Sequence, residues 1–214
     1  MNILICGASG FIGRHLATSF ASAGHQVFAG IRSAAGLDAA PDFVRKIDFA
    51  TPGSNYTAAV KGMDVVINAV GMIRGTPQQF ATVQTDAPIA LFEACRAAGV
   101  NHFVQISALG PNLPETQLPP FLASKYQADA YFQRVLASNP GTLRCSIIKP
   151  SLIIGHDGSS SRLFRALATL PLPCVPQGEI RLQPVHIDDL CAAIVRDVEA
   201  TAQACAQSPS SNNG

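Results

Sequence analysis

Continuously hydrophobic runs alternate with segments of helical character along most of this 214-residue sequence. A run in which almost every position is apolar is typical of a strand covered on both faces, as the strands of a parallel sheet are. The expected strands are residues 2–6, 26–31, 43–47, 64–69, 102–106 and 144–149. The expected helices are residues 11–23, 54–60, 77–98 and 122–138. Repeated alternation of this kind implies right-handed crossovers, and it predicts an α/β fold with a doubly wound parallel sheet.

The first expected strand leads directly into a glycine-spaced turn, which a helical segment follows. A side chain at Gly7 or Gly10 would obstruct the close approach of a pyrophosphate, and the phosphate would meet the free N–H groups and the positive dipole end of the helix. Such spacing is common in loops, but a strand before it and a helix after it are typical of a dinucleotide-binding turn. The residues expected to bind the cofactor here are Gly7, Ser9, Gly10, Phe11, Ile12 and Gly13.

Two residues after the second expected strand bear on which dinucleotide is bound. At this position a carboxylate would bind the ribose hydroxyls of NAD, whereas an arginine pairs with the additional 2′-phosphate of NADP. The sequence has Arg32 followed by Ser33, and the nearest acid, Asp38, comes several residues too late. We therefore predict that NADP(H) is favoured over NAD(H).

Residues after the third and fourth expected strands complete the predicted nucleotide site. Asp48 follows the third strand, where its carboxylate either reaches the adenine amino group or caps a turn or helix. The fourth strand ends in Asn68, Ala69, Val70 and Gly71, whose small residues let the backbone approach the cofactor.

Composition limits the compartment and the kinds of partner. A hydrophobic content of 48% suits one domain with a large core. With 15 Lys and Arg against 14 Asp and Glu, and no basic run, we expect no nucleic-acid partner. No apolar run reaches the ~18 residues of a membrane span, and the first strand leaves no room for a signal peptide. The six cysteines are scattered without zinc-type spacing, so we expect no metal site and a reducing, cytoplasmic compartment.

Prolines interrupt the alternation in two places. Residues 111–120 form a proline-rich loop between a strand end and a helix start, where we expect one wall of a substrate site. Residues 170–184 are too broken for a long element and favour a loop or small lobe. The expected domains are a nucleotide-binding core in residues 1–150, a substrate lobe with a closing helix packed on that core in 151–203, and a disordered tail in 204–214.

Five further motifs, taken with the glycine turn, resemble the short-chain dehydrogenase/reductase superfamily. They are NAVG at 68–71, QISALG at 105–110, ASK at 123–125, KPSLIIG at 149–155 and PVHIDDL at 184–190. The resemblance covers residues 1–203 and is to the extended and atypical branch. The SALG run and LFRALA at 163–168 resemble the group related to the nucleotide-binding accessory subunit of respiratory complex I. The resemblance implies a Rossmann fold that binds NAD(P).

The same resemblance implies which residues carry chemistry. In active members a Ser after the fifth strand orients the substrate carbonyl, a Tyr exchanges the proton, and a Lys four residues later lowers the pKa of that Tyr and holds the nicotinamide ribose. Ser107 and Lys125 match the Ser and the Lys, and Pro150 shapes the chain beside the nicotinamide. The Tyr position holds Phe121, whose ring has no proton to exchange, so the usual acid/base group is missing.

Other side chains are candidates for the missing proton donor. Tyr126 and Tyr131 lie on unsuitable turns of the same helix. His156 and His186 are either alternative donors or structural residues. The pattern around Asp188 and Asp189 favours a helix cap over a metal ligand, because no further ligand lies at usable spacing.

Two functions follow from these residues. The first is an NADP(H)-dependent oxidoreductase or epimerase-like enzyme with altered acid/base machinery, acting on a small carbonyl or quinone-like substrate. The second is a catalytically silent nucleotide-binding protein that serves as a redox sensor or an assembly scaffold. Fold alone does not decide between them.

Overall fold

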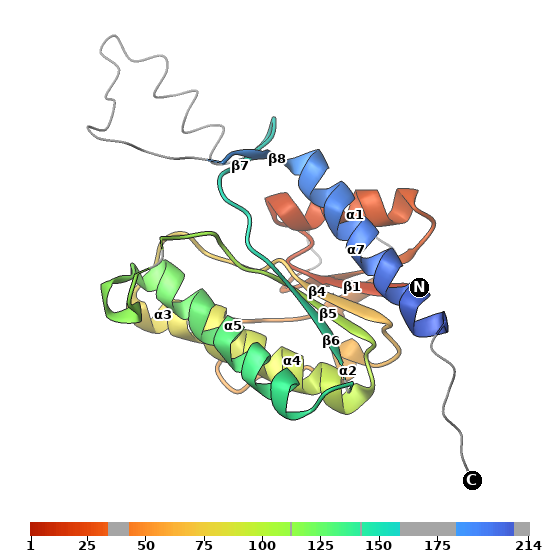
Figure 1. The fold of residues 1–214 in the computed structure, drawn as a ribbon, viewed down its shortest axis with the longest axis horizontal. Coiled ribbons are helices and arrows are strands. Elements are labelled where there is room, and N and C mark those ends of the chain that lie inside the picture. Colours follow the sequence, from red (N-terminus) through yellow and green to blue (C-terminus); the bar gives the residue numbers. More distant parts are fainter. Residues whose placement is uncertain (34–42, 112, 142, 159–182, 208–214) are drawn as a thin grey trace.

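A six-stranded parallel sheet with helices on both faces forms the body of the molecule (Figure 1). The computed structural model describes residues 1–33, 43–111, 113–141, 143–158 and 183–207. The strand order is β3-β2-β1-β4-β5-β6, and every neighbouring pair is parallel. The strands are β1 Asn2–Cys6, β2 Gln26–Ile31, β3 Val44–Lys46, β4 Val65–Asn68, β5 His102–Ile106 and β6 Arg144–Ile148. The predicted doubly wound α/β fold is confirmed.

The helices occupy most of the segments between the strands. They are α1 Phe11–Ser22, α2 Thr57–Val60, α3 Pro77–Ala81, η2 Thr82–Asp86, α4 Ala87–Ala98, η3 Glu115–Gln117, α5 Pro120–Ser138 and α7 Ile187–Gln207. Strands β7 Ile153–Ile154 and β8 Val185–His186 form a second, two-stranded parallel sheet. Helix α5 begins two residues before the expected start at 122, because a proline fits the first turn of a helix, where its missing N–H costs nothing.

The prediction of one continuous α-helix over residues 77–98 is wrong for residues 82–86. Residues Thr82–Asp86 form a π-helical turn between α3 and α4. Pro88 follows at the start of α4, and a proline inside a helix has no N–H to donate and collides with the carbonyl four residues earlier. A widened turn relieves that collision, so Pro88 accounts for the π-helix.

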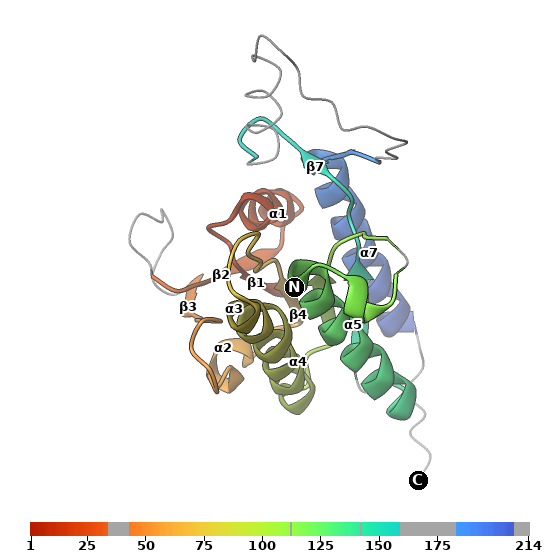
Figure 2. The same cartoon turned by 90° about the vertical axis from the view of Figure 1, so that its left-hand side faces the viewer.

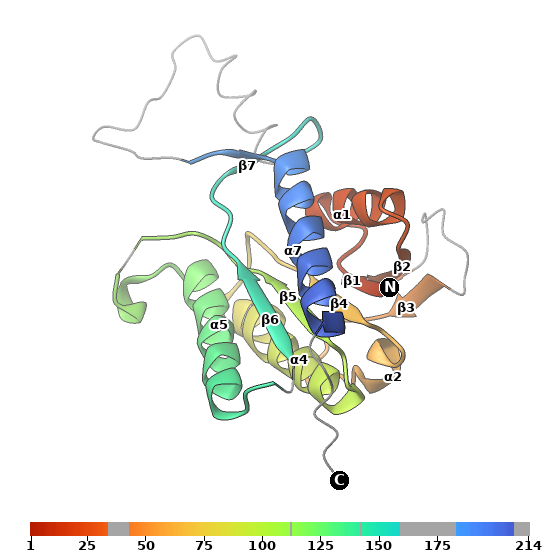
Figure 3. The ribbon, with the colours of Figure 1, turned by 45° about the vertical axis from the view of Figure 1, so that its right-hand side comes forward.

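Alternate residues of each strand enter two separate hydrophobic cores. On one face, Leu4 and Cys6 of β1 belong to a core that also contains three phenylalanines in mutual ring contact. These are Phe92, Phe103 and Phe132, from α4, β5 and α5, with ring centroids 4.7–5.4 Å apart. On the other face, Ile3 and Ile5 pack with α1 and α7. Figures 2 and 3 show these two helix layers on opposite sides of the sheet.

The closing helix expected after residue 151 is α7, which lies beside α1. Its apolar side chains, among them Ile187, Ile194 and Val198, are buried in the core that α1 covers. Three of its acids face histidines of other elements, in the pairs Asp188–His15, Asp197–His102 and Glu199–His25. Helix α7 continues to Gln207, beyond the expected start of the tail at 204, and residues 208–214 lie outside the described chain.

Asp188 and Asp189 do not cap α7, so that interpretation is wrong. Both lie within its first turn, where their charge suits the positive end of the helix dipole. The capping contact comes from His186, whose Nδ1 accepts the backbone N–H of Asp188 at 3.4 Å. An imidazole nitrogen here replaces the carboxylate oxygen that the pattern favoured.

Some expectations fall partly or wholly outside the described residues. Of the segment 170–184, only the last two residues are described. Asp38 and the LFRALA motif at 163–168 lie wholly outside the described residues. Among the described cysteines, Cys6, Cys95, Cys145 and Cys191 are free thiols. Within the described chain no helix combines the length and the apolar character that crossing a membrane requires. The described side chains also form no cluster of metal ligands.

The contact between α1 and the turn before it should be the part of the fold least tolerant of substitution. A Cβ at Gly13 would overlap the Gly7 carbonyl oxygen and lie 2.9 Å from the Cα of Ala8, both in rigid backbone. We expect Gly13→Ala to lower the free energy of unfolding by about 3 kcal/mol. Gly24→Ala is the control, because Gly24 has open space around it and a φ of 81°, which costs alanine only about 1 kcal/mol. Equal losses in thermal or urea unfolding would contradict the contact.

Candidate nucleotide and catalytic site

The glycine turn after β1 brings bare backbone to the edge of the sheet. Gly7 has a φ of 82°, and its N–H donates to the carbonyl of Gly30 at 2.8 Å. A Cβ on Gly7 would lie 3.2 Å from the backbone of Ala69, so a side chain has no room there. Gly10 is the N-cap of α1, and no side chain caps the start of that helix. The first turn of α1 therefore offers its N–H groups and the positive end of its dipole to a ligand.

A cavity of about 550 Å³ opens at this turn. It lies at the carboxyl ends of β1, β2 and β4, where the strand order reverses direction and α/β proteins bind ligands. Its walls come from the glycine turn, the end of β2, the 69–72 backbone and the α3–η2 segment, together with Ile47, Phe49 and Ala50.

The structure brings only part of the predicted cofactor set together around this cavity. The predicted residues that line it are Gly7, Ser9, Gly10, Arg32, Ala69, Val70 and Gly71. The predicted residues that do not are Phe11, Ile12, Gly13, Ser33, Asp48, Asn68, Lys125 and Pro150. Sequence reasoning missed the contribution of α3 and η2, whose Gln78, Gln79, Thr82 and Val83 also line the cavity.

Asp48 and Asn68 are each adjacent in sequence to residues that line the cavity. The Asp48 carboxylate accepts the N–H of Ala50 at 2.9 Å and the hydroxyl of Thr51 at 2.8 Å, and these bonds lower the pKa of Asp48. The turn cap, one of the two roles left open for Asp48, is present in the structure, and contact with an adenine amino group stays a prediction. Asn68 is buried and accepts the N–H of Val70 at 3.1 Å, which sets the path of the backbone along the cavity.

The side chain of Gln84 joins the nucleotide cavity to α5. Its Oε1 accepts the N–H of Met72 at 3.0 Å, and its Nε2 donates to the Phe121 carbonyl at 3.2 Å and the Ser124 hydroxyl at 3.0 Å. Gln84 belongs to the π-helical turn and is almost fully buried. The sequence signal for this turn was Pro88 inside an otherwise helical pattern.

Lys125 is buried beside the end of β5. Its Nζ donates to the Ile106 carbonyl at 2.9 Å and lies 5.9 Å from the centre of the Phe121 ring. A Cβ on Gly71 would lie 3.7 Å from the same nitrogen, so Lys125 borders the far end of the 69–72 wall. Burial lowers the pKa of Lys125 to about 8, and the nearby Asp129 carboxylate opposes that shift.

Ser107 points at a carboxylate that the sequence reasoning did not single out. The Ser107 hydroxyl donates to Oδ2 of Asp129 at 2.7 Å, and Nζ of Lys149 lies 3.3 Å from the same oxygen. Lys149 in turn lies 4.7 Å from the centre of the Tyr126 ring. The available signal was spacing, because Asp129 follows Lys125 by four residues and therefore shares its helix face.

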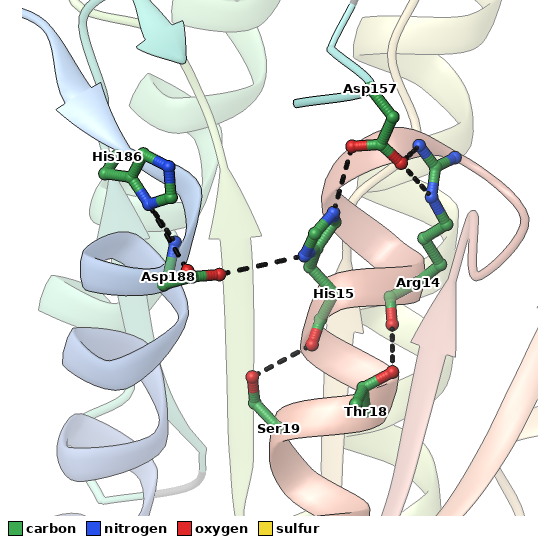
Figure 4. Close-up of polar contacts among 7 residues, drawn as sticks. All are labelled: Arg14, His15, Thr18, Ser19, Asp157, His186 and Asp188. Carbon is green, nitrogen blue, oxygen red and sulfur yellow. Dashed lines mark hydrogen bonds and ion pairs between the residues drawn. The ribbon is translucent and has the colours of Figure 1, made fainter. Parts of the chain in front are cut away.

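Of the two histidines considered as proton donors, His186 lies in a cluster of charged side chains. His186 contacts Asp188 of α7, and through Asp188 it belongs to a surface cluster with His15, Asp157 and Arg14 (Figure 4). Asp157 accepts hydrogen bonds from Arg14 and faces His15, which ties the turn after β7 to α1. The Arg14 guanidinium holds the pKa of Asp157 down to about 2. These contacts connect the start of α7 to α1.

Comparison with known proteins finds similarity to two reductases and to a protein solved with NAD. A ceramide reductase from Caulobacter vibrioides is 31% identical over 202 residues, which cover 90% of this chain and 59% of the reductase. A 3-diazoavenalumate denitrifying reductase from a Streptomyces species is 29% identical over 96% of this chain and 74% of its own length. The solved structure of MoeE5 in complex with UDP-glucuronic acid and NAD is 25% identical, covers 91% of this chain and 71% of MoeE5, and has a TM-score of 0.70.

The chain thus spans less than two thirds of the ceramide reductase that it resembles. A family model described as NAD(P)H-binding matches residues 7–165, which include the glycine turn, the cavity and α5. That match covers most of the chain and agrees with the parallel sheet and the backbone-lined cavity. The chain therefore belongs to the NAD(P)H-binding family of Rossmann-type, epimerase-like and reductase-like proteins.

Proposed function

We propose that this protein is an NADP(H)-dependent reductase of a small carbonyl or quinone-like substrate. The observation that carries the proposal is the cavity at the glycine turn, which has Arg32 on one wall and the 69–72 backbone on another. When bound there, a reduced nicotinamide supplies a hydride. The relatives named as reductases support reduction as the reaction class.

The residues around the cavity fit a dinucleotide in three ways. The uncapped start of α1 suits the pyrophosphate, because its N–H groups have no side-chain partner. The Arg32 guanidinium suits a 2′-phosphate, which accepts paired N–H bonds. Lys125 borders the 69–72 wall next to Phe121, so its ammonium suits the nicotinamide ribose. Ser107, at the end of β5, is then the residue that contacts the substrate oxygen.

Phe121 favours a second candidate function. Without a phenol beside Lys125, the protein would bind NADP(H) without turnover and act as a redox sensor or assembly scaffold, as the resemblance to the complex I accessory group suggests. The two functions share the cofactor site and differ in whether NADPH is consumed. Multiple turnover with a carbonyl or quinone excludes the second.

Arg32 should set the preference for NADPH. We expect Arg32→Ala to weaken NADPH binding by about 10–100-fold, because one charge-assisted pair with the 2′-phosphate is lost. NADH binding should change little. The measurement is a titration of each nucleotide, followed by its fluorescence.

The matched control is Arg134→Ala, which removes an exposed arginine of α5 that contacts Tyr131. It should leave both affinities unchanged. Equal binding of NADH and NADPH by the unaltered protein would remove the NADP preference from the proposal, and binding of neither would end the proposal as a whole.

Nucleotide binding should also depend on pH through Lys125. Its ammonium is present below a pKa of about 8 and is lost as the pH rises through that value. We expect NADPH affinity to fall about tenfold between about pH 7 and about pH 9.5, the worth of one charge-assisted hydrogen bond. Lys125→Met should bind more weakly at neutral pH and show no such fall. A pH-dependent fall of the same size in Lys125→Met would assign the titration to another group.

A further inference from the structure

Asp129 is a buried carboxylate whose position the nucleotide cavity does not explain. Its side chain is only 3% exposed, and it lies one helical turn beyond Lys125 on α5. Oδ2 accepts the Ser107 hydroxyl at 2.7 Å, whereas the buried Oδ1 has no hydrogen-bond partner among the described residues. Burying a carboxylate with an unpaired oxygen costs free energy. An asparagine could accept the same serine hydrogen bond without that cost, so the charge itself needs an explanation.

Lys149 connects this buried carboxylate to solvent. Its side chain is 39% exposed, and its Nζ lies 3.3 Å from Oδ2 of Asp129. The ring of Tyr126, 4.7 Å away, forms a cation–π contact that holds the ammonium in place. A continuous path of exchangeable protons therefore runs from water through Lys149 and Asp129 to the hydroxyl of Ser107.

Asp129 lies on the same face of α5 as Lys125 and Phe121, the position that has no hydroxyl proton to exchange. Phe121, Lys125 and Asp129 are spaced by four residues, so they lie above one another along the helix. Lys125 also binds the carbonyl of Ile106, the residue before Ser107. The carboxylate thus stands two turns from the phenyl ring, on the same side of the helix.

We propose that Lys149 and Asp129 form a proton relay through Ser107, which replaces the phenol missing at Phe121. The relay rests on the proposed reductase function. Ser107 is the catalytic residue, because its hydroxyl touches the substrate oxygen. Asp129 and Lys149 act through it as positioning residues that also hold the proton.

The step balances as follows for reduction of a carbonyl. The carbonyl carbon gains the hydride and its two electrons, the C=O π pair moves onto oxygen, and that oxygen takes the Ser107 hydroxyl proton. The serine oxygen takes a proton from Oδ2 of Asp129, which has received it from the Lys149 ammonium. The Lys149 amine then recovers a proton from water. The observed direction of the Ser107–Asp129 bond, with serine donating, is the arrangement for the reverse reaction, in which an alcohol is oxidised.

The first test combines removal of the relay with restoration of the phenol. Turnover is followed as NADPH consumption with phenanthrenequinone as the carbonyl probe. We expect Asp129→Asn to lower kcat by about 10²–10⁴-fold while NADPH affinity stays within about twofold. Adding Phe121→Tyr to Asp129→Asn should restore most of the loss, because the phenol makes the relay dispensable. Glu93→Gln is the matched control, since it neutralises a carboxylate of α4 that binds Arg96 of the same helix and Tyr131 of α5.

The second test separates a relay from a purely structural ion pair. Lys149→Arg keeps the positive charge beside Asp129, but a guanidinium does not give up its proton in proteins. The relay predicts a kcat loss close to that of Asp129→Asn. A structural pair predicts activity close to that of the unaltered protein. Lys149→Arg tests the relay even if Asp129→Asn does not fold.

The outcomes also separate this proposal from the function on which it rests. Turnover by Phe121→Tyr alone, with none by the unaltered protein, overturns the relay and leaves the cofactor site intact. NADPH binding without turnover in either protein overturns both the relay and the reductase function, and favours the silent nucleotide-binding protein. Unchanged kcat in Asp129→Asn overturns the relay alone.

Discussion

The backbone contact between Gly13 of α1 and Gly7 of the preceding turn fixes the geometry on which the rest of the site depends. Because no side chain stands between them, α1 starts directly against the end of β1. The same turn is held from its other side by the bond from Gly7 to the Gly30 carbonyl, so β1, β2 and α1 meet at one point. Because these elements meet there, backbone atoms and the start of α1 form one side of the cavity. Backbone N–H groups at a helix start are what an anionic nucleotide requires.

The site has two halves, and a single proline accounts for how they are joined. Pro88 widens the preceding helix, and the widened turn aims the Gln84 amide between Met72 at the cavity and Phe121 on α5. The loop that borders the cavity and the helix that carries Lys125 are thereby held in fixed positions relative to each other. The cost of bringing polar groups into this interior is offset because each end of the buried amide has a hydrogen-bond partner.

The sequence was sufficient to predict the parts of the structure that a local rule determines. Apolar runs placed β1, β2 and β5 to the residue, and the glycine spacing located the turn and cavity, because burial on both faces and close backbone approach act over a few residues. The sequence was insufficient where contacts between residues far apart in the chain determine the structure. The partnership of Ser107 with Asp129 joins residues from different elements, and no short pattern records it.

The order of the strands leaves β3 and β6 at the two ends of the sheet, each with one neighbour in the described part of the chain. An edge strand offers unpaired N–H and C=O groups to any other extended chain. Here the edges carry cations: Arg45 and Lys46 lie in β3, and Arg144 begins β6. When two copies meet edge to edge, like charges face one another across the ladder, and repulsion opposes continuation of the sheet from one molecule into the next. The charges on these two strands therefore oppose pairing of one sheet with another through these edges.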